Sequence, residues 1–504
     1  MESTHGKLKF KEKVGYGFGD LGSVLFWQTI MVYLLYFYTD VFGLSAAIAG
    51  VMFFVSRVLD AFFDVVIGMT ADRTKSRWGK FRPYILFGAV PLAVAAIAAF
   101  TAPSFGGTGK IVYAYITFLL FMFLYSTVNI PYTSLLGVIS DDPIDRTSAS
   151  SFKFVGAYLA GIIVSATALP FAKIFGKGAN PIEAAQSGWH TTMLIYGAAA
   201  VLFFIITFLS TKERIKPIAK EQTNVKRDLK DIVRNIPWIM LFAITILFIL
   251  FNCVRLNVTT HYFKYYVGEQ AVPWLTHILN FCREYIVGPV YSLFGKQKLA
   301  LLNPNETFGF EVLASTFNTV GQSLSLVGVL LVPWFAKTFG QKRATIILFV
   351  AAIICTGSFI FFKPENIFLI LFFQAIGSIT GGPISALLWV MYADTADYSE
   401  WKTGRRATGL VFSASIMSNK LGWAFGSMIA AFILASTGFV ANVAQNIGTL
   451  NGLKAMMSVI PIIPGVIALT ILILFYKLDE PIMKKVKEDL EKRREEYDKK
   501  AETI

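Results

Sequence analysis

The sequence predicts an all-α membrane protein with twelve transmembrane helices arranged as two six-helix bundles. Of its 504 residues, 55% are hydrophobic and only 15% are charged, and the mean hydropathy is +0.59. A soluble domain of this composition would expose too much apolar surface to stay in solution. Apolar runs of about 20 residues, the length that crosses a bilayer, also recur along the chain. Both observations make lipid the solvent for most of it.

The placement of the basic residues is the third observation. The net charge is +14, but no single domain collects it, so we expect no nucleic-acid partner. Lys and Arg instead fall in short segments on one side of the apolar runs, which marks the cytoplasmic side. We expect a multi-pass protein of the cell inner (plasma) membrane with both termini in the cytoplasm. The basic segments are 7–13, 73–82, 212–234, 337–343, 402–406 and the tail from 484.

Each span is predicted from an apolar run bounded by charged or turn-forming residues. The first span has to serve as the insertion signal, because the N-terminus lacks the cleavage pattern of a signal peptide. In chain order the predicted spans are 18–38, 45–70, 82–102, 111–139, 150–174, 188–210, 235–265, 311–336, 343–362, 366–393, 407–437 and 455–477.

The polar stretch 211–234 divides the spans six and six. It is predicted to be a cytoplasmic linker between an N-terminal bundle, 1–210, and a C-terminal bundle, 235–477. The two halves show a weak internal repeat, because GMTADRTKSRWGKFRP follows the second span and FAKTFGQKRA follows the eighth, its counterpart in the second half. A six-plus-six repeat around a mid-chain cytoplasmic loop is typical of major facilitator transporters.

Two further segments lie outside the spans. The outward connection at about 266–310 is interrupted by prolines and charges, which favours either an interfacial helix or a lid. The tail 478–504 carries Ile482, Val486 and Leu490 at helical spacing among many charges. We expect the tail to form a helix that lies against the cytoplasmic surface.

Charged residues at helix ends suggest an ion-pair gate between the bundles. They occur in the motif after the second span and in YADTADYSEWKTGRR, which closes the tenth span. Such charges can bridge the bundles in one state and separate in another. A role as positive-inside anchors explains the charge of the first motif but not its glycines or its acid. The candidate gating residues are Asp72, Arg73, Arg77, Asp394, Asp397, Arg405 and Arg406.

Two aspartates lie inside the otherwise apolar second span. Asp60 and Asp64 are four residues apart and therefore share one helix face, with Arg57 three residues before Asp60. An ionised carboxylate at that depth costs about 2.5–3.5 kcal/mol, so a pair requires a compensating interaction. A cation held between the carboxylates, with Arg57 balancing charge, would provide it. The alternative is a buried ion-pair cluster that only fixes helix packing.

Other polar residues in the spans are candidates for binding a solute. Asp20 follows Gly17 and Gly19, which allow close approach of a neighbouring backbone or a polyhydroxylated ligand. Asn129 precedes a mid-span proline, which frees a backbone carbonyl there. Arg255 is deep enough to require a partner, either a ligand oxygen or an acid.

Two lysines complete the set of ionisable candidates. Lys420 lies in the middle of the eleventh span with no acid beside it in sequence, so Asp60 and Asp64 are its expected partners across the cavity. Lys153 at the start of the fifth span is either a snorkelling anchor or a cavity lysine.

No residue pattern points to an enzyme. Cys253, Cys282 and Cys355 are far apart, and the four histidines form no cluster. The spans contain no nucleophile–base constellation. We therefore expect no catalytic residue, no cofactor other than a coupling ion (H⁺ or Na⁺), and no metal beyond Na⁺ at Asp60 and Asp64.

The motifs together resemble the glycoside–pentoside–hexuronide:cation symporter family, the group that includes the melibiose permease. The resemblance rests on GFGD, FYTDVFGLS, RVLDAFFD, SRWGKFRPYI, NIPYTSL, YADTADYSEWKTGRR and NKLGWAFG. It implies a major facilitator fold and import of a sugar, glycoside or sugar acid with a cation. By motif, the implied cation ligands are Asp60, Asp64 and Ser126, next to Arg57. The implied sugar-site residues are Asp20, Asn129, Lys153 and Lys420.

Two departures from the family pattern bear on the ion and the cargo. The residue before the second acid is Phe63 instead of an asparagine, which removes an oxygen ligand and favours protons over sodium. Asn129 stands where the permease has an acid in its fourth span. This difference implies either a different sugar or different hydrogen bonds to the same sugar hydroxyls. A transporter of a non-sugar solute such as a lysolipid, or a sugar sensor without transport, remains an alternative. We expect a monomer whose partners are the solute, the cation and the bilayer.

Overall fold

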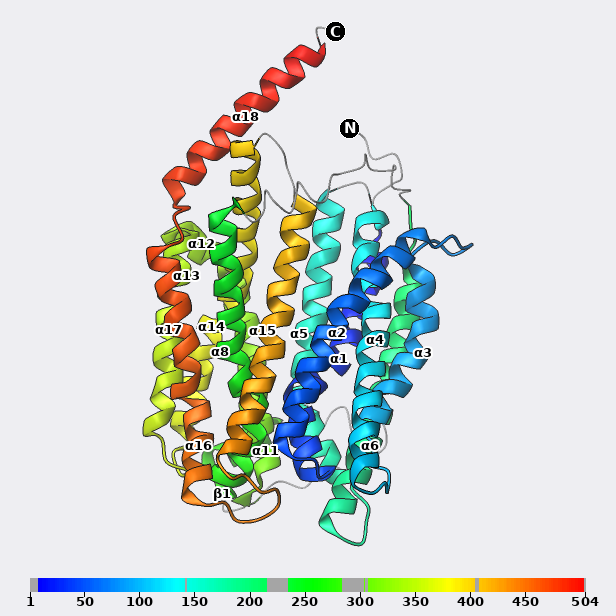
Figure 1. Ribbon diagram of the computed structural model, residues 1–504, viewed down its shortest axis with the longest axis vertical. Helices are drawn as coiled ribbons and strands as arrows, with labels where there is room; N and C mark the ends of the chain where they lie inside the picture. The colour runs from blue at the N-terminus through cyan, green and yellow to red at the C-terminus, as the bar shows by residue number, and fades with distance from the viewer. Residues whose placement is uncertain are drawn as a thin grey trace.

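The computed structural model shows long helices that run side by side between two ends of the molecule (Figure 1). In the described part of the chain the only strands are β1 (Gln270–Ala271) and β2 (Thr307–Phe308), which pair antiparallel. The two groups of helices in Figure 1 correspond to the predicted halves of the chain. The structure describes residues 8–140, 143–214, 234–282, 303, 307–403 and 408–502.

The helices follow the predicted order. In the N-terminal bundle they are α1 (Phe10–Tyr36), continued by the π-helical turn η1 (Phe37–Val41), α2 (Ala46–Arg73), α3 (Arg82–Ala99), α4 (Gly107–Ile139), α5 (Pro143–Ile174) and α6 (Pro181–Ser210). In the C-terminal bundle they are α8 (Ile236–His261) with the turn η2 (Tyr262–Val267), α9 (Pro273–Cys282), α11 (Phe310–Leu330), α12 (Val332–Phe339), α13 (Gln341–Gly357) with η4 (Ser358–Phe361), α14 (Ile367–Thr403), α15 (Thr408–Ser436), α16 (Ile447–Met457) and α17 (Val459–Leu474), followed by α18 (Glu480–Glu502).

These helices confirm the predicted membrane architecture. Among the described residues, ten helices are long and apolar enough to cross a bilayer, and α11 with α12 forms an eleventh span bent by 49°. The helix α15 also runs the length of its bundle (Figure 1), but Asn419 and Lys420 make its middle polar. Counting α15, the helices match the twelve predicted spans.

The first and the last span both begin earlier than predicted. The helix α1 begins at Phe10, not at residue 18, because its polar first turns are held by ion pairs. Glu12 accepts from Arg214 at 2.6 Å and Lys13 pairs with Asp145 at 2.8 Å. The last span begins at Ile447 and is interrupted at Ser458, between α16 and α17.

The C-terminal tail forms the predicted helix, α18, and one side of its first turns is buried. Met483, Val486 and Leu490 pack into the core of the C-terminal bundle. Ile482, which shares the helical spacing noted in the sequence, is 41% exposed. The reason is that three- and four-residue steps from Met483, not strict four-residue steps, keep a helical stripe on one side. Beyond this contact α18 projects away from the bundles (Figure 1).

The outward connection is only partly described. Its helix α9 buries Leu275 and Thr276 against the bundle, and Trp274 meets Phe368 edge to face at 5.9 Å. The choice between an interfacial helix and a lid rests on the rest of the segment, and 283–302 and 304–306 lie outside the described residues.

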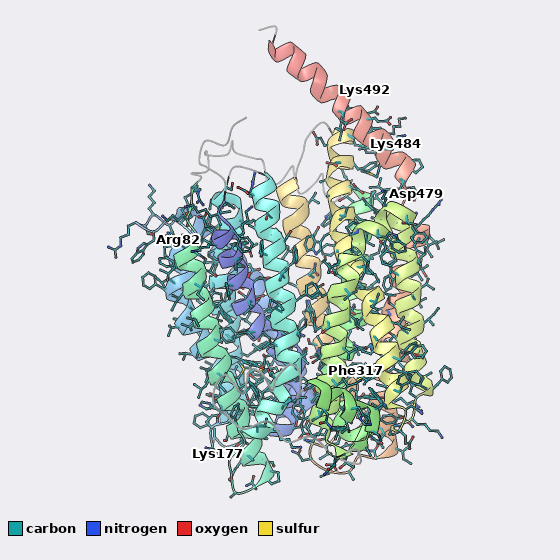
Figure 2. The ribbon with its side chains drawn as sticks, turned by 180° about the vertical axis from the view of Figure 1, so that it is seen from behind. Arg82, Lys177, Phe317, Asp479, Lys484 and Lys492 are labelled. Carbon is teal, nitrogen blue, oxygen red and sulfur yellow. The ribbon has the colours of Figure 1, made fainter. Side chains whose placement is uncertain are left out.

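The outer surface of the helices is apolar, as a lipid-facing surface requires. Large exposed apolar side chains occur on helices of both bundles, among them Phe62, Phe87, Ile116, Phe154, Leu202, Phe368 and Ile467. Charged side chains mark the ends instead. Figure 2 shows Arg82, Lys484 and Lys492 toward the end from which α18 projects, and Lys177 at the opposite end.

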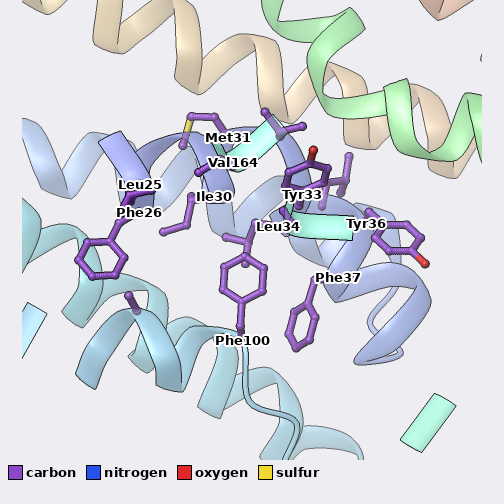
Figure 3. Close-up of a cluster of buried hydrophobic side chains, with 14 of the residues drawn as sticks. Leu25, Phe26, Ile30, Met31, Tyr33, Leu34, Tyr36, Phe37, Phe100 and Val164 are labelled. Atoms are coloured by element: carbon purple, nitrogen blue, oxygen red, sulfur yellow. The ribbon is translucent and has the colours of Figure 1, made fainter. Parts of the chain in front are cut away.

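The core is built around α1, which is more enclosed than the other spans of the described chain. Figure 3 shows Leu25, Phe26, Ile30 and Leu34 of α1 in one buried cluster. Across the bundle interface, α2 packs against α15, α5 against α11, and α1 against α8. The paired acids of α2 therefore face the helix that carries Lys420.

Candidate functional site

The two acids of α2 share one basic partner from the other bundle. The Lys420 Nζ atom lies 2.8 Å from Asp60 Oδ2 and also donates to Asp64 Oδ2. Asp60 is 1% exposed, whereas Asp64 and Lys420 are half-buried. The structure thus brings together the three residues that sequence reasoning paired. The ion pair joins α2 to α15 and therefore joins the two bundles.

Ser126 of α4 completes the surroundings of Asp60. Its hydroxyl donates to Asp60 Oδ1 at 2.7 Å, so the predicted oxygen ligand lies beside the predicted carboxylate. Phe63 meets Phe123 of α4 edge to face at 5.2 Å. An aromatic contact therefore occupies the side of the pair where the family pattern has an asparagine.

Arg57 lies close enough to attract the two acids but does not contact them. Within the described part of the chain it makes no ion pair, and its guanidinium lies 4.4 Å from the centre of the Trp27 ring. One of its nitrogens also donates to the sulfur of Met31 at 3.0 Å. The side chain is long enough to leave the Asp60 face and stack on α1, where a cation–π contact compensates part of its burial.

Asn129 belongs to a polar group one turn along α4. Its side-chain nitrogen donates to the Tyr125 hydroxyl at 2.7 Å, and its oxygen accepts from Thr133 at 3.2 Å. Tyr125 in turn stacks on Trp27 at 5.0 Å with 27° between the rings. Sequence reasoning missed Trp27 and Tyr125, because aromatic residues are frequent in this chain and neither lies in a distinctive pattern.

Asp20 and Lys153 lie beside a stacked pair of tyrosines. Tyr16 and Tyr132 stack at 4.8 Å, and the Lys153 ammonium lies 5.7 Å from the centre of the Tyr132 ring. Asp20 is buried, and the described residues give its carboxylate no hydrogen bond or short ion pair. With respect to the described residues, its oxygens are therefore open to accept from a ligand.

Glycines let α1 and α5 approach each other closely beside Asp20. A Cβ atom on Gly17 would lie 2.6 Å from the Phe152 carbonyl oxygen, and one on Gly19 would enter the Tyr132 ring. On the facing helix α5, a Cβ on Gly156 would collide with the Gly17 carbonyl. The sequence-based reason for these glycines, a close backbone approach beside Asp20, is confirmed.

Arg255 lies in a separate cavity of about 210 Å³ in the C-terminal bundle. Its guanidinium donates to the Thr356 hydroxyl and to the Gln374 side-chain oxygen, both at 3.1 Å. The same cavity is lined by Asn318, which donates to the Tyr33 hydroxyl of α1 at 3.5 Å. Tyr33 is 13 residues from Asp20 on one helix, which is about 20 Å at 1.5 Å per residue. Arg255 and Asp20 therefore lie at different depths.

A buried cluster that sequence reasoning missed joins the bundles at the end away from α18. Asp40 in η1 has a fully buried carboxylate that accepts from Lys264 at 2.8 Å and from the Tyr265 hydroxyl. Thr39 donates to it at 2.7 Å, and His261 Nε2 lies 3.2 Å away. We call these residues the Asp40 closure. The available signal was an acid in FYTD and a lysine in HYFKYY, each within a span.

A loop before α16 is part of the Asp40 closure. The Asn442 side chain accepts from Lys264 at 2.7 Å and donates to the Asp40 carbonyl at 2.8 Å. Its φ of 60° lies in the left-handed region, which asparagine tolerates better than most residues. The closure therefore ties α1 of one bundle to two segments of the other.

The candidate gating residues at the opposite end are only partly described. Arg73 and Arg77 are exposed, and Arg77 lies 4.2 Å over the ring of its neighbour Trp78. Asp394 is buried and Asp397 half-buried. The Asp72 side chain, together with Arg405 and Arg406, lies outside the described residues. A gate formed by these charges remains a prediction.

The glycine of the motif after the second span has a structural explanation. Gly79 has a φ of +106°, and the Glu213 carboxylate accepts from the backbone N–H groups of Lys80, Phe81 and Arg82 at 2.8, 2.7 and 3.1 Å. A side chain on Gly79 would strike Glu213. The motif therefore clamps the loop before α3 to the end of α6, within one bundle.

Two six-helix bundles with ionisable residues at their interface define a membrane transporter of the major facilitator type. The chain belongs to the MFS/sugar transport protein family, whose model matches residues 15–303 and 290–480. It is 34% identical to the inner membrane symporter YicJ of Escherichia coli, over 96% of this chain and 95% of that one. It is 33% identical to the isoprimeverose transporter of Lactiplantibacillus pentosus, over 96% and 92%.

Solved structures support the fold. A bacterial homologue of the human lysosomal transporter Spinster, in an inward-facing and unoccupied conformation, has a TM-score of 0.66 at 14% identity, covering 93% of this chain and 97% of that one. A D-xylose–proton symporter has a TM-score of 0.51 at 13% identity, covering 92% and 95%. At such identities the likeness concerns the fold alone.

Proposed function

We propose that this chain is a cation-coupled symporter that imports a sugar, glycoside or sugar acid by alternating access. The observation that carries the proposal is the Lys420 ammonium held between Asp60 and Asp64 across the bundle interface. The names of its relatives, which include a putative glycoside/cation symporter of Escherichia coli, support the cargo class.

The geometry supplies a reason for coupling. Two carboxylates and the two cations Lys420 and Arg57 balance in charge, so this conformation needs no added ion at Asp60 and Asp64. A coupling cation that binds the carboxylates has to displace the Lys420 ammonium. Displacement would release one tie between α2 and α15 and so let the bundles move relative to each other. Cation binding and conformational change are then linked at one site.

We propose protons as the coupling ion. A sodium ion requires several oxygen ligands, and the site offers the two carboxylates and Ser126, whose hydroxyl already donates to Asp60. The contact between Phe63 and Phe123 adds no oxygen on that side. A proton requires only one carboxylate oxygen. Two acids on one helix face also disfavour double ionisation once Lys420 has left.

We further propose that α18 and the start of α1 face the cytoplasm of a cell bounded by this inner membrane. An even number of spans puts both on one side. That side carries Arg82, Lys484 and Lys492 (Figure 2), which agrees with the preference of basic residues for the cytoplasm. The Asp40 closure would then seal the outward path.

The proposal is tested with purified protein in liposomes loaded with unlabelled sugar. Counterflow of radiolabelled sugar is expected, since an enzyme or a sensor does not exchange solute. Accumulation should follow an imposed pH gradient without sodium. Accumulation that follows only a sodium gradient at fixed pH would refute the proton assignment, and a lack of counterflow across uronates, pentosides and disaccharides would refute sugar transport.

A further inference from the structure

The Arg255 cavity holds a positive charge that no described acid balances. Arg255 is in no ion pair among the described residues, and its two partners, Thr356 and Gln374, are neutral. Its Nε atom is buried and has no hydrogen-bond partner in the described part of the chain, while Phe359 covers one face of the guanidinium at 4.9 Å. The described residues use two of its five N–H donors, so the group can still bind a planar acceptor.

The other ionisable residues of the site balance one another. Lys420 is paired with Asp60 and Asp64, and Arg57 attracts the same two acids without an ion pair. Lys153 lies near Asp20. The guanidinium of Arg255 is therefore an unbalanced positive charge before any coupling cation binds. A bound cation adds a second positive charge. A neutral sugar would leave both uncompensated in a low-dielectric site, which is costly. A sugar that carries one negative charge would compensate one of them.

The size and lining of the cavity fit part of a ligand. Its volume of about 210 Å³ is below the roughly 300–1,000 Å³ of a complete small-molecule pocket. Amide side chains of Asn318, Gln322 and Gln374 line it with the guanidinium. The amide of Gln322 has no hydrogen-bond partner among the described residues and faces α5, where a Cβ atom on Gly161 would lie 3.1 Å from it. The cavity is thus open to polar contacts at the bundle interface.

We propose that this cavity is a subsite for the carboxylate of a sugar acid and that Arg255 selects such a cargo over a neutral sugar. A planar carboxylate matches the fork of N–H donors on a guanidinium. The inference rests on the proposed sugar transport and narrows it to one chemical class. Nothing in it depends on which ion is coupled.

The experiment compares two probes that differ only at the sixth carbon: methyl β-glucuronide and methyl β-glucoside. Binding is measured by calorimetry, and exchange by counterflow, for the wild type and for Arg255→Gln. We expect the wild type to bind the glucuronide at least tenfold more tightly. In Arg255→Gln the glucuronide should lose affinity by about tenfold to a hundredfold, the range for a charge-assisted hydrogen bond, while the glucoside changes by less than about threefold.

Two controls keep the test decisive. Lys363→Gln removes a positive charge from an exposed position of the same bundle and should leave the ratio of the two affinities unchanged. Arg255→Lys keeps the charge and should retain part of the preference, which a purely structural role would not produce. An equal preference for the two probes in the wild type, or an equal loss of both in Arg255→Gln, overturns the inference. If neither probe nor any other sugar exchanges, sugar transport itself is wrong.

Discussion

Asp40→Asn should open the path that the Asp40 closure seals. The substitution keeps the side chain's shape but removes the charge that Lys264 and the Tyr265 hydroxyl face. The side chain of Asp40 is fully buried, whereas that of Lys264 is 18% exposed. Loss of the charge therefore weakens contacts made only while the bundles are closed at this end, and it shifts the conformational equilibrium toward the open state.

The size of this shift follows from the burial of the pair. Removing one partner of a fully buried ion pair costs about 3–5 kcal/mol. Partial exposure of Lys264 lets water compensate, so we take about 2–3 kcal/mol as the loss of the closed state. At 1.36 kcal/mol for each factor of ten, the ratio of open to closed molecules should rise about 30-fold to 150-fold.

The assay measures how fast a maleimide reacts with a cysteine placed on the inner side of the Asp40 closure. Thr259 is buried and lines the Arg255 cavity, so Thr259→Cys reports its opening to a membrane-impermeant maleimide added on the side of the closure. The background has Cys253, Cys282 and Cys355 replaced by serine. Where opening is fast relative to labelling, the rate follows the open population, and Asp40→Asn should raise it at least tenfold.

A matched control removes an exposed ion pair that also joins the bundles. Lys173 pairs with Glu311 at 3.2 Å, with Lys173 60% exposed. Such pairs contribute about 0–1 kcal/mol, so Lys173→Gln should change labelling by no more than about fivefold. If Asp40→Asn labels no faster than Lys173→Gln in the same background, the Asp40 closure does not hold this end shut.

Three other substitutions test the site and its scaffold. Asp20 lies at a different depth from Arg255, so Asp20→Ala should slow counterflow of labelled sugar past that point by about tenfold to a hundredfold, and unchanged counterflow would place Asp20 outside the transport path. Gly156→Val should prevent recovery of folded protein, because its side chain collides with Gly17, whereas Gly68→Ala, with open space at that position, should fold normally. Glu213→Gln should destabilise the loop before α3 by about 1.5–3 kcal/mol, seen as a lower midpoint of thermal unfolding, and an unchanged midpoint would contradict the clamp.

The sequence alone predicted the membrane spans and the ion pair of Lys420 with Asp60 and Asp64. Lipid removes water as a partner, so twenty-residue apolar runs have to be helices and a charge within them has to find another charge. These two constraints predicted that Lys420 meets Asp60 and Asp64, although more than 350 residues separate them. Glycines near Asp20 likewise predicted a close helix contact.

The sequence could not predict contacts of residues that had more than one suitable partner, because the three-dimensional arrangement selects among these partners. Arg57 had an acid on its own helix face but stacks on Trp27, because a long side chain reaches either. Asp40 and Lys264 lie near span ends, where water would also satisfy them, so their pairing across 224 residues was not required. The Asp40 closure thus depends on how the bundles meet, which no local pattern encodes.

The most direct test of coupling through Asp60, Asp64 and Lys420 is to measure accumulation and exchange separately in Asp64→Asn. The variant keeps the fold and the sugar contacts but removes one of the carboxylates for which the coupling cation and Lys420 compete. In liposomes with an imposed ion gradient, we predict that accumulation of labelled sugar is lost while counterflow persists. Accumulation at the wild-type level in Asp64→Asn would contradict the account.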